Sequence, residues 1–285
     1  MSSRILPEFD LLVPQSIPEA VNMLTKYQNK AAVMAGGTDL LVLMKAGLQS
    51  ECVLSLAEVA GLDYLLYDPT DGLRIGAMAT LAQIVDSEVV RNNYPALWQS
   101  ACVNGTPQTR NKATVVGNIL RASPAGDCCV AVMALGGKVV LQGAAGRREV
   151  DIDNFWTGYR QTARQAFEFA VELKIPAQVG KNAFKRMTRS DQDLSKLNAA
   201  ACLDMAGSVC QGARLAVGCV APTIVRMKKA EEILKGKEIT EAVLNEVAEA
   251  VKASATPIDD VRSSAWYRKE VSGVLVTRTI QKALA

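Results

Sequence analysis

The spacing of apolar residues predicts alternating helices and strands in the first part of the chain. Over residues 18–27, Ala20, Val21 and Leu24 fall on one face of a helix, and Ser16 is placed to cap it. Short apolar runs bounded by turn residues indicate strands. The further elements predicted here are strands at 31–35, 51–55, 64–67, 73–76, 138–142, 148–151 and 167–175, a hairpin turn at 68–72, an aromatic loop at 155–160, and helices at 40–48, 81–87, 96–103 and 127–135.

A polar, glycine-bearing stretch at 177–182 marks a predicted domain boundary, with one domain at 1–176 and the other at 177–285. Beyond it the pattern predicts three strands and then three helices, which together indicate an α+β fold. The strands are expected at 183–187, 199–205 and 213–220 and the helices at 225–234, 241–254 and 264–284, the last with Val271, Val274, Leu275 and Ile280 as its apolar positions.

Composition narrows the class of protein. A length of 285 residues with 49% hydrophobic residues is enough for two domains with substantial cores. The charge balance of 32 basic and 29 acidic residues gives +3, which is too small to indicate nucleic-acid binding. The longest apolar run, 128–135, is too short to span a membrane, and residues 1–14 lack the apolar core of a signal peptide. We therefore expect a cytoplasmic protein.

Cysteine and histidine usage limits the chemistry. The seven cysteines form no Cys-x-x-Cys pair, and their odd number in apolar surroundings is typical of reduced core thiols. Adjacent Cys128 and Cys129 are poorly spaced for an iron–sulfur cluster, and no metal site is expected. Histidine is absent, which excludes imidazole relays and ordinary zinc catalysis. Chemistry must therefore depend on a bound cofactor or on carboxylates, lysine, tyrosine or cysteine.

Two glycine-bearing segments are the strongest candidates for a binding site. The segment 35–39 (Ala-Gly-Gly-Thr-Asp) lies between a predicted strand and a predicted helix, and the segment 114–118 (Thr-Val-Val-Gly-Asn) precedes a second polar run at 122–127. Glycines allow several backbone N–H groups to point into one concavity, which suits a phosphate oxygen. Two such loops are suited to the two phosphates of a dinucleotide.

Each of these residues also has an ordinary structural explanation. Neither loop is a Rossmann or P-loop motif, and each is compatible with a simple turn at the end of a strand. Thr38 and Asp39 are placed either to cap the next helix or to bind a phosphate and a ribose hydroxyl, respectively. Asp127 is as well placed to cap its own helix, and Lys185 is typical of a solvated strand position.

Several motifs together resemble one known family along nearly the whole chain. They are 35–41 (AGGTDLL), 107–118 (PQTRNKATVVGN), 122–127 (ASPAGD), 158–160 (GYR), 184–186 (FKR), 220–223 (VAPT) and 257–268 (PIDDVRSSAWYR). The chain is similar to the FAD-binding (medium) subunit of molybdenum hydroxylases, the family of xanthine dehydrogenase and aerobic-type carbon monoxide dehydrogenase.

The resemblance implies a two-part FAD-binding module of the vanillyl-alcohol-oxidase/PCMH type, followed by a small antiparallel sheet with helices. One departure concerns Val116, where the family usually has glycine; valine resists positive φ and fills space near the phosphate. The cofactor contacts implied by position are Val33, Met34, Ala35, Gly36, Gly37, Thr38, Asp39, Thr114, Val115, Val116, Gly117, Asn118, Asp127 and Lys185.

The resemblance also implies a function as an FAD-carrying electron-transfer subunit. A molybdopterin-binding large subunit would hydroxylate the substrate, and a 2Fe-2S small subunit would relay electrons to FAD, which passes them to an acceptor such as NAD or oxygen. Two alternatives are a stand-alone FAD-dependent oxidoreductase of the same fold and a non-catalytic assembly subunit, the latter favoured only by Val116. The substrate pocket would lie on another chain, so the substrate stays open.

Overall fold

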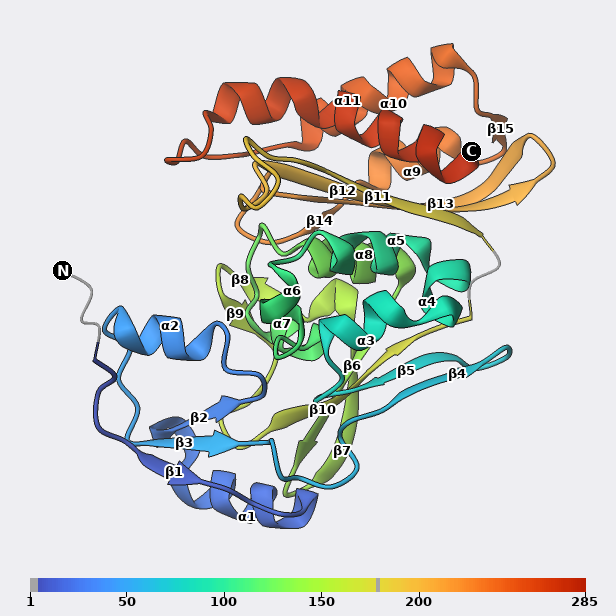
Figure 1. The fold of residues 1–285 in the computed structure, drawn as a ribbon. Helices are drawn as coiled ribbons and strands as arrows, with labels where there is room; N and C mark the ends of the chain where they lie inside the picture. The colour runs from blue at the N-terminus through green and yellow to red at the C-terminus, as the bar shows by residue number, and fades with distance from the viewer. Residues whose placement is uncertain (1–4, 178–179) are drawn as a thin grey trace.

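The computed structural model describes residues 5–177 and 180–285. The chain begins with a small parallel sheet in the order β1-β3-β2, formed by β1 (Asp10–Leu12), β3 (Cys52–Ser55) and β2 (Ala31–Met34) (Figure 1). Helix α1 (Ile17–Tyr27) buries Ala20, Val21 and Leu24 as predicted, and Ser16 accepts a hydrogen bond from the backbone of Glu19. Strand β1 was not predicted, since three residues carry too little periodicity. Also in this part are η1 (Gln28–Lys30) and α2 (Leu40–Lys45).

The second sheet is antiparallel and has five strands in the order β4-β5-β10-β6-β7. Its strands are β4 (Leu65–Asp68), β5 (Gly72–Gly76), β10 (Phe169–Ile175), β6 (Lys138–Gly143) and β7 (Gly146–Asp151), and the pairing of β4 with β5 confirms the predicted hairpin turn. The predicted aromatic loop at 155–160 is partly wrong, because β8 (Trp156–Gly158) and β9 (Gln161–Thr162) pair as a small hairpin. The short η2 (Ile152–Asn154) precedes it.

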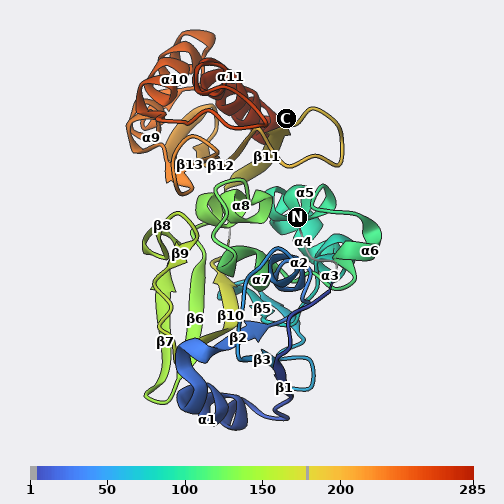
Figure 2. The same cartoon turned by 90° about the vertical axis from the view of Figure 1, so that its left-hand side faces the viewer.

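Six helices lie between β5 and β6 in sequence. They are α3 (Leu81–Asp86), α4 (Glu88–Asn93), α5 (Pro95–Cys102), α6 (Pro107–Arg110), α7 (Val115–Leu120) and α8 (Asp127–Leu135). All nine residues of α8 are buried, because the third sheet covers one side of it and α5 and α7 pack against it from the N-terminal part of the chain (Figure 1). Figure 2 shows the same central position of α8 from the side.

The third sheet is antiparallel, in the order β11-β12-β13-β14, with β15 paired to β13. Its strands are β11 (Lys181–Met187), β12 (Leu197–Ala206), β13 (Val209–Gly218), β14 (Val225–Arg226) and β15 (Lys237–Glu238). The helices α9 (Lys228–Leu234), α10 (Glu241–Ser254) and α11 (Ala265–Leu284) cover its outer face (Figure 1). The chain therefore has the predicted α+β architecture, a two-part module followed by a small antiparallel sheet with helices.

One predicted apolar position of α11 is wrong. Leu275 and Ile280 are buried, but Val274 is 43% exposed. The face of α11 that meets α10 instead includes Gly273, where an added Cβ would lie 2.6 Å from the Ala248 carbonyl oxygen. Close backbone approach through a glycine fixes how α11 is rotated, and this turns Val274 toward solvent.

The buried side chains form two clusters, one around the first two sheets and α8, and one between the third sheet and α9–α11. The proposed boundary at 177–182 includes residues 178 and 179, which lie outside the described residues, so it stays a prediction. Among the described residues, no helix combines the length and the apolar character needed to cross a bilayer.

Candidate cofactor-binding site

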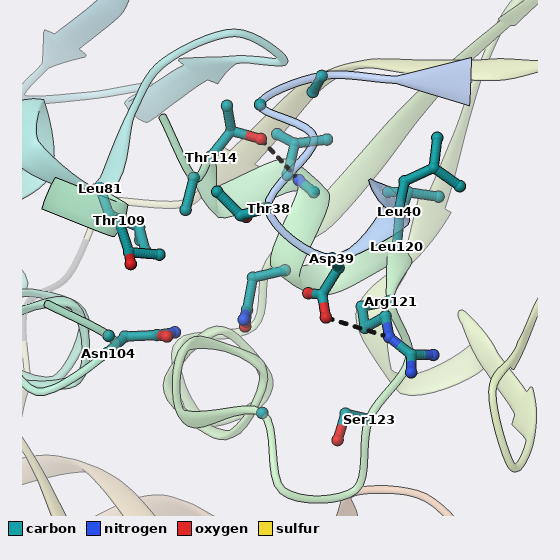
Figure 3. A pocket seen from close by; sticks show the side chains of 18 of the residues that line it. Thr38, Asp39, Leu40, Leu81, Asn104, Thr109, Thr114, Leu120, Arg121 and Ser123 are labelled. Carbon is teal, nitrogen blue, oxygen red and sulfur yellow. Dashed lines mark hydrogen bonds and ion pairs between the residues drawn. The ribbon is translucent and has the colours of Figure 1, made fainter. Parts of the chain in front are cut away.

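A cavity of about 620 Å³ brings the two glycine loops together. The end of β2 and the first loop line it with residues 33–39, and the second loop lines it with Thr114, Val116, Gly117 and Asn118 (Figure 3). Cavities of this volume are typical of sites for cofactors. The two loops that the sequence placed near a dinucleotide are therefore neighbours in space, although some eighty positions separate them in the chain.

The first loop is shaped by its two glycines. A Cβ on Gly36 would lie 1.6 Å from the carbonyl oxygen of Lys112, and Gly37 has φ +72°. No other residue type fits the first position, and few adopt the second conformation. The loop therefore packs directly on the backbone that leads into the second loop. Among the described residues, the N–H groups of Gly36, Gly37 and Thr38 donate to no acceptor within the chain.

Asp39 does not cap α2. It occupies the N-cap position, but its side chain makes no capping hydrogen bond. Its carboxylate instead lies 3.5 Å from Nε of Arg121, as Figure 3 marks by a dashed line. The Asp39 side chain is 59% exposed. The capping interpretation of Asp39 is therefore wrong, and the carboxylate stays at the cavity.

The second loop begins a helix and is not the end of a strand. Thr114 is the N-cap of α7, and its Oγ1 accepts a hydrogen bond of 3.0 Å from the N–H of Gly117. A Cβ on Gly117 would lie 2.8 Å from that Oγ1, so a larger residue at this position would require the cap to shift. The alternative of a simple turn at the end of a strand is therefore wrong for this loop.

Val115 and Val116 have different surroundings. Val116 lies in the first turn of α7 with a negative φ, so valine meets no backbone strain there, and its side chain lines the cavity. Val115 is fully buried and packs in the core instead of lining the cavity. The expected conflict between valine and positive φ at Val116 therefore does not arise.

Asp127 is a buried carboxylate and does not cap α8, because Gly126 occupies the N-cap. Its Oδ1 accepts hydrogen bonds from Ser195 Oγ at 2.7 Å and Asn198 Nδ2 at 2.6 Å, and its Oδ2 lies 3.2 Å from Arg186 Nη1. Burial raises the pKa of this carboxyl, whereas its three donors act in the opposite direction. All three donors come from the third sheet or the loop beside it, so this part of the cavity wall is fixed by the C-terminal residues.

Lys185 lies away from the glycine loops. The next residue of the strand, Arg186, lines the cavity, whereas Lys185 does not. Lys185 lines a separate hollow together with Arg186 and Lys282. Partial burial and the charge of Lys185 lower the pKa of Lys282.

Sequence reasoning missed several polar residues of the cavity wall. Arg160 and Arg186 stand in motifs that were recognised, but no contact was assigned to them, and nothing local to Arg164 indicated a site. The missed polar lining residues are Asn104, Thr109, Arg121, Ser123, Arg160, Arg164, Arg186, Gln192 and Asp193.

The cysteines do not contribute to this site. All seven are free thiols, and neither Cys128 nor Cys129 lines the cavity. Burial raises the pKa of the Cys128 thiol to about 12, which makes it a poor nucleophile. Among the described residues, no group of three potential metal ligands occurs.

An α+β module with two glycine loops on one cavity, beside a small antiparallel sheet, defines a dinucleotide-binding protein. The comparisons with known proteins agree. The family described as "FAD binding domain in molybdopterin dehydrogenase" matches residues 7–178, and that described as "CO dehydrogenase flavoprotein C-terminal domain" matches residues 182–283. The chain belongs to this family of FAD-binding oxidoreductase subunits, and its cofactor is FAD.

Curated relatives and solved structures cover almost the whole chain. The chain is 30% identical to the carbon monoxide dehydrogenase medium chain of Hydrogenophaga pseudoflava, over 99% of each chain. It is 31% identical to the nicotine 6-hydroxylase medium subunit of Paenarthrobacter nicotinovorans, over 98% of each. A carbon monoxide dehydrogenase structure from Hydrogenophaga pseudoflava superposes with a TM-score of 0.95 at 30% identity and 98% coverage of both chains.

Proposed function

We propose that this chain is the FAD-carrying electron-transfer subunit of a molybdenum hydroxylase complex. The observation that carries the proposal is the pair of glycine loops that face one cavity, in a chain that belongs to an FAD-binding family. FAD supplies redox chemistry, since it accepts two electrons and passes them on singly or as hydride. The residues of this chain bind the cofactor, orient it and exclude water.

The proposed partners are a molybdopterin-binding large subunit and a 2Fe-2S small subunit, with NAD or another carrier as electron acceptor. Relatives are named medium chains or medium subunits, which supports assembly with other chains. We also propose the cytoplasm as the location, residues 1–176 as the FAD-binding PCMH-type domain and 177–285 as the C-terminal flavoprotein domain.

The proposed cofactor contacts are those implied residues that line the cavity. The free N–H groups of Gly36, Gly37 and Thr38 are suited to phosphate oxygens. We assign Val115 a packing role and leave Lys185 outside the contact set, because neither lines the cavity. The remaining set is Val33, Met34, Ala35, Gly36, Gly37, Thr38, Asp39, Thr114, Val116, Gly117, Asn118 and Asp127.

Addition of FAD to the purified chain tests cofactor binding. We expect oxidised-flavin absorption bands to remain after desalting and FAD to be released on denaturation. A colourless protein would contradict the proposal if Val116→Gly were colourless too. Flavin binding by Val116→Gly alone would instead show that valine blocks the second loop.

The electron-transfer role needs the partner subunits. We expect the reconstituted complex to reduce its acceptor only when this chain carries FAD. Equal reduction by a complex assembled with the FAD-free chain would rule out the role, and substrate oxidation by the isolated flavoprotein would favour a stand-alone oxidoreductase.

A further inference from the structure

The charged side chains that line the cavity do not balance. They comprise four arginines and three aspartates. Two of the arginines form ion pairs with aspartates of the cavity wall, Arg121 with Asp39 at 3.5 Å and Arg186 with Asp127 at 3.2 Å. The third aspartate, Asp193, forms an ion pair at 3.3 Å with Arg189, which does not line the cavity. Arg160 and Arg164 therefore remain as two positive charges without a carboxylate partner among the described residues.

Arg160 is an exposed residue that lines the cavity and has an unusual backbone conformation. Tyr159 and Arg160 form the two-residue turn of the β8–β9 hairpin, and Arg160 has φ 57°. Glycine or asparagine normally occupies such a position, because a longer side chain costs about 1 kcal/mol or more there. The Arg160 guanidinium lies 5.0 Å from the ring centroid of Tyr159 and forms no hydrogen bond or ion pair with a described residue.

Arg164 comes from the segment after the same hairpin. Its Nη1 donates to the carbonyl oxygens of Gln165 at 2.9 Å and Glu168 at 2.8 Å. The Glu168 carboxylate is already bound by Arg148, at 2.6 and 2.8 Å. Burial lowers the pKa of Arg164, and the charge of the Glu168 carboxylate offsets this effect only in part.

We propose that Arg160 and Arg164 neutralise the diphosphate of the bound FAD. The inference rests on the proposed cofactor site. A diphosphate between two sugars carries two negative charges, which matches the two guanidinium groups that line the cavity without an ion pair to a described residue. The glycine loops offer neutral N–H donors, so these arginines supply the charge that the loops lack.

FAD titration of the full-length apoprotein tests this assignment. We expect Arg160→Gln and Arg164→Gln each to raise the Kd for FAD about tenfold, the usual effect of losing one charge-assisted hydrogen bond. The conservative variants Arg160→Lys and Arg164→Lys should recover much of the affinity. Arg147→Gln is the matched control, because Arg147 is exposed and does not line the cavity.

Salt dependence separates a charge effect from a structural one. Raising the salt from about 0.01 M to about 1 M shortens the Debye length from about 30 Å to about 3 Å, so it should weaken FAD binding by the wild type. The glutamine variants should show a flatter salt dependence at unchanged circular dichroism. An unchanged Kd with unchanged salt dependence in both variants would overturn the inference, whereas a wild type that binds no FAD would overturn the proposed function itself.

A second arm distinguishes FAD from a nicotinamide dinucleotide, which also contains a diphosphate. The FAD-loaded wild type and glutamine variants are titrated with NADH under anaerobic conditions. We expect the apparent affinity for NADH to be the same in all of them. Normal FAD affinity combined with weakened NADH binding in the variants would overturn the assignment to FAD.

Discussion

The first glycine loop is held by backbone packing, whereas the second is held by a side chain. Gly36 fits against the Lys112 carbonyl, where no side chain has room. Thr114 caps α7 through its hydroxyl, in a contact that other small polar residues also make. We therefore expect the two loops to tolerate substitution differently, although both line the same cavity.

The carboxylates beside the two loops differ in the same way. Asp39 is 59% exposed and has one partner at 3.5 Å. Asp127 is 8% exposed and accepts from three side chains. The exposed carboxylate is free to respond to a ligand, whereas the buried one joins the N-terminal part of the chain to the third sheet.

Gly36→Ala is expected to have the largest effect on stability and on FAD binding. The added methyl would overlap the Lys112 carbonyl, so the loop must move, and we expect a loss of more than about 3 kcal/mol and no FAD retained on desalting. Urea denaturation and flavin absorbance measure the two effects. Gly212→Ala is the control, because its Cβ would have only a contact at 4.0 Å. Tight FAD binding by Gly36→Ala would mean that the close approach is not required.

Asp127→Asn should come next in effect. The substitution leaves Arg186 without its carboxylate and places an amide beside the donors Ser195 and Asn198. We therefore expect the free energy of unfolding to fall by about 3 kcal/mol. Urea denaturation at neutral pH measures it. Asp151→Asn is the control, because Asp151 is exposed and lies 3.6 Å from Lys138. Equal stability of the two variants would show that the buried network contributes nothing.

Local patterns predicted the longer strands and the longer helices, because their periodicity extends over enough residues. The prediction of 241–254 coincides with α10, and that of 127–135 with α8. Helices α4, α6 and α7 were missed, since they have four to six residues each and depend on single caps such as Thr114. Short elements of this kind are specified by tertiary contacts more than by pattern.

The glycine loops could be predicted because glycine leaves a local signal, whereas the partners of Asp127 could not. Ser195 and Asn198 lie 68 and 71 positions away in sequence, so local reading suggested a cap instead. Arg164 gave no signal either, since the absence of a carboxylate partner is visible only when the whole cavity wall is assembled. Charge pairs between residues far apart in the sequence therefore could not be predicted from local patterns in this chain.

Thr114→Ala, in the second loop, is expected to destabilise the protein less than Gly36→Ala in the first. Loss of the cap leaves the Gly117 N–H without its acceptor, and we expect a loss of about 1 kcal/mol. Thr114→Ser retains the hydroxyl and should restore most of the stability. Thermal unfolding of both variants measures the difference. A loss as large as that of Gly36→Ala would show that the two loops are equally intolerant.

The smallest effect is expected for Asp39→Asn. The pair with Arg121 is long and half exposed, so its loss should change the free energy of unfolding by about 0.5 kcal/mol or less. The asparagine Oδ1 still accepts a hydrogen bond, and FAD should therefore remain bound if Asp39 contacts a ribose hydroxyl. Asp39→Ala removes that acceptor and should bind FAD more weakly than Asp39→Asn at equal stability, which parallel FAD titrations would measure. Equal affinity of the two variants would exclude the ribose contact, and Asp39 would then differ from Asp127 in being neither a structural group nor a ligand.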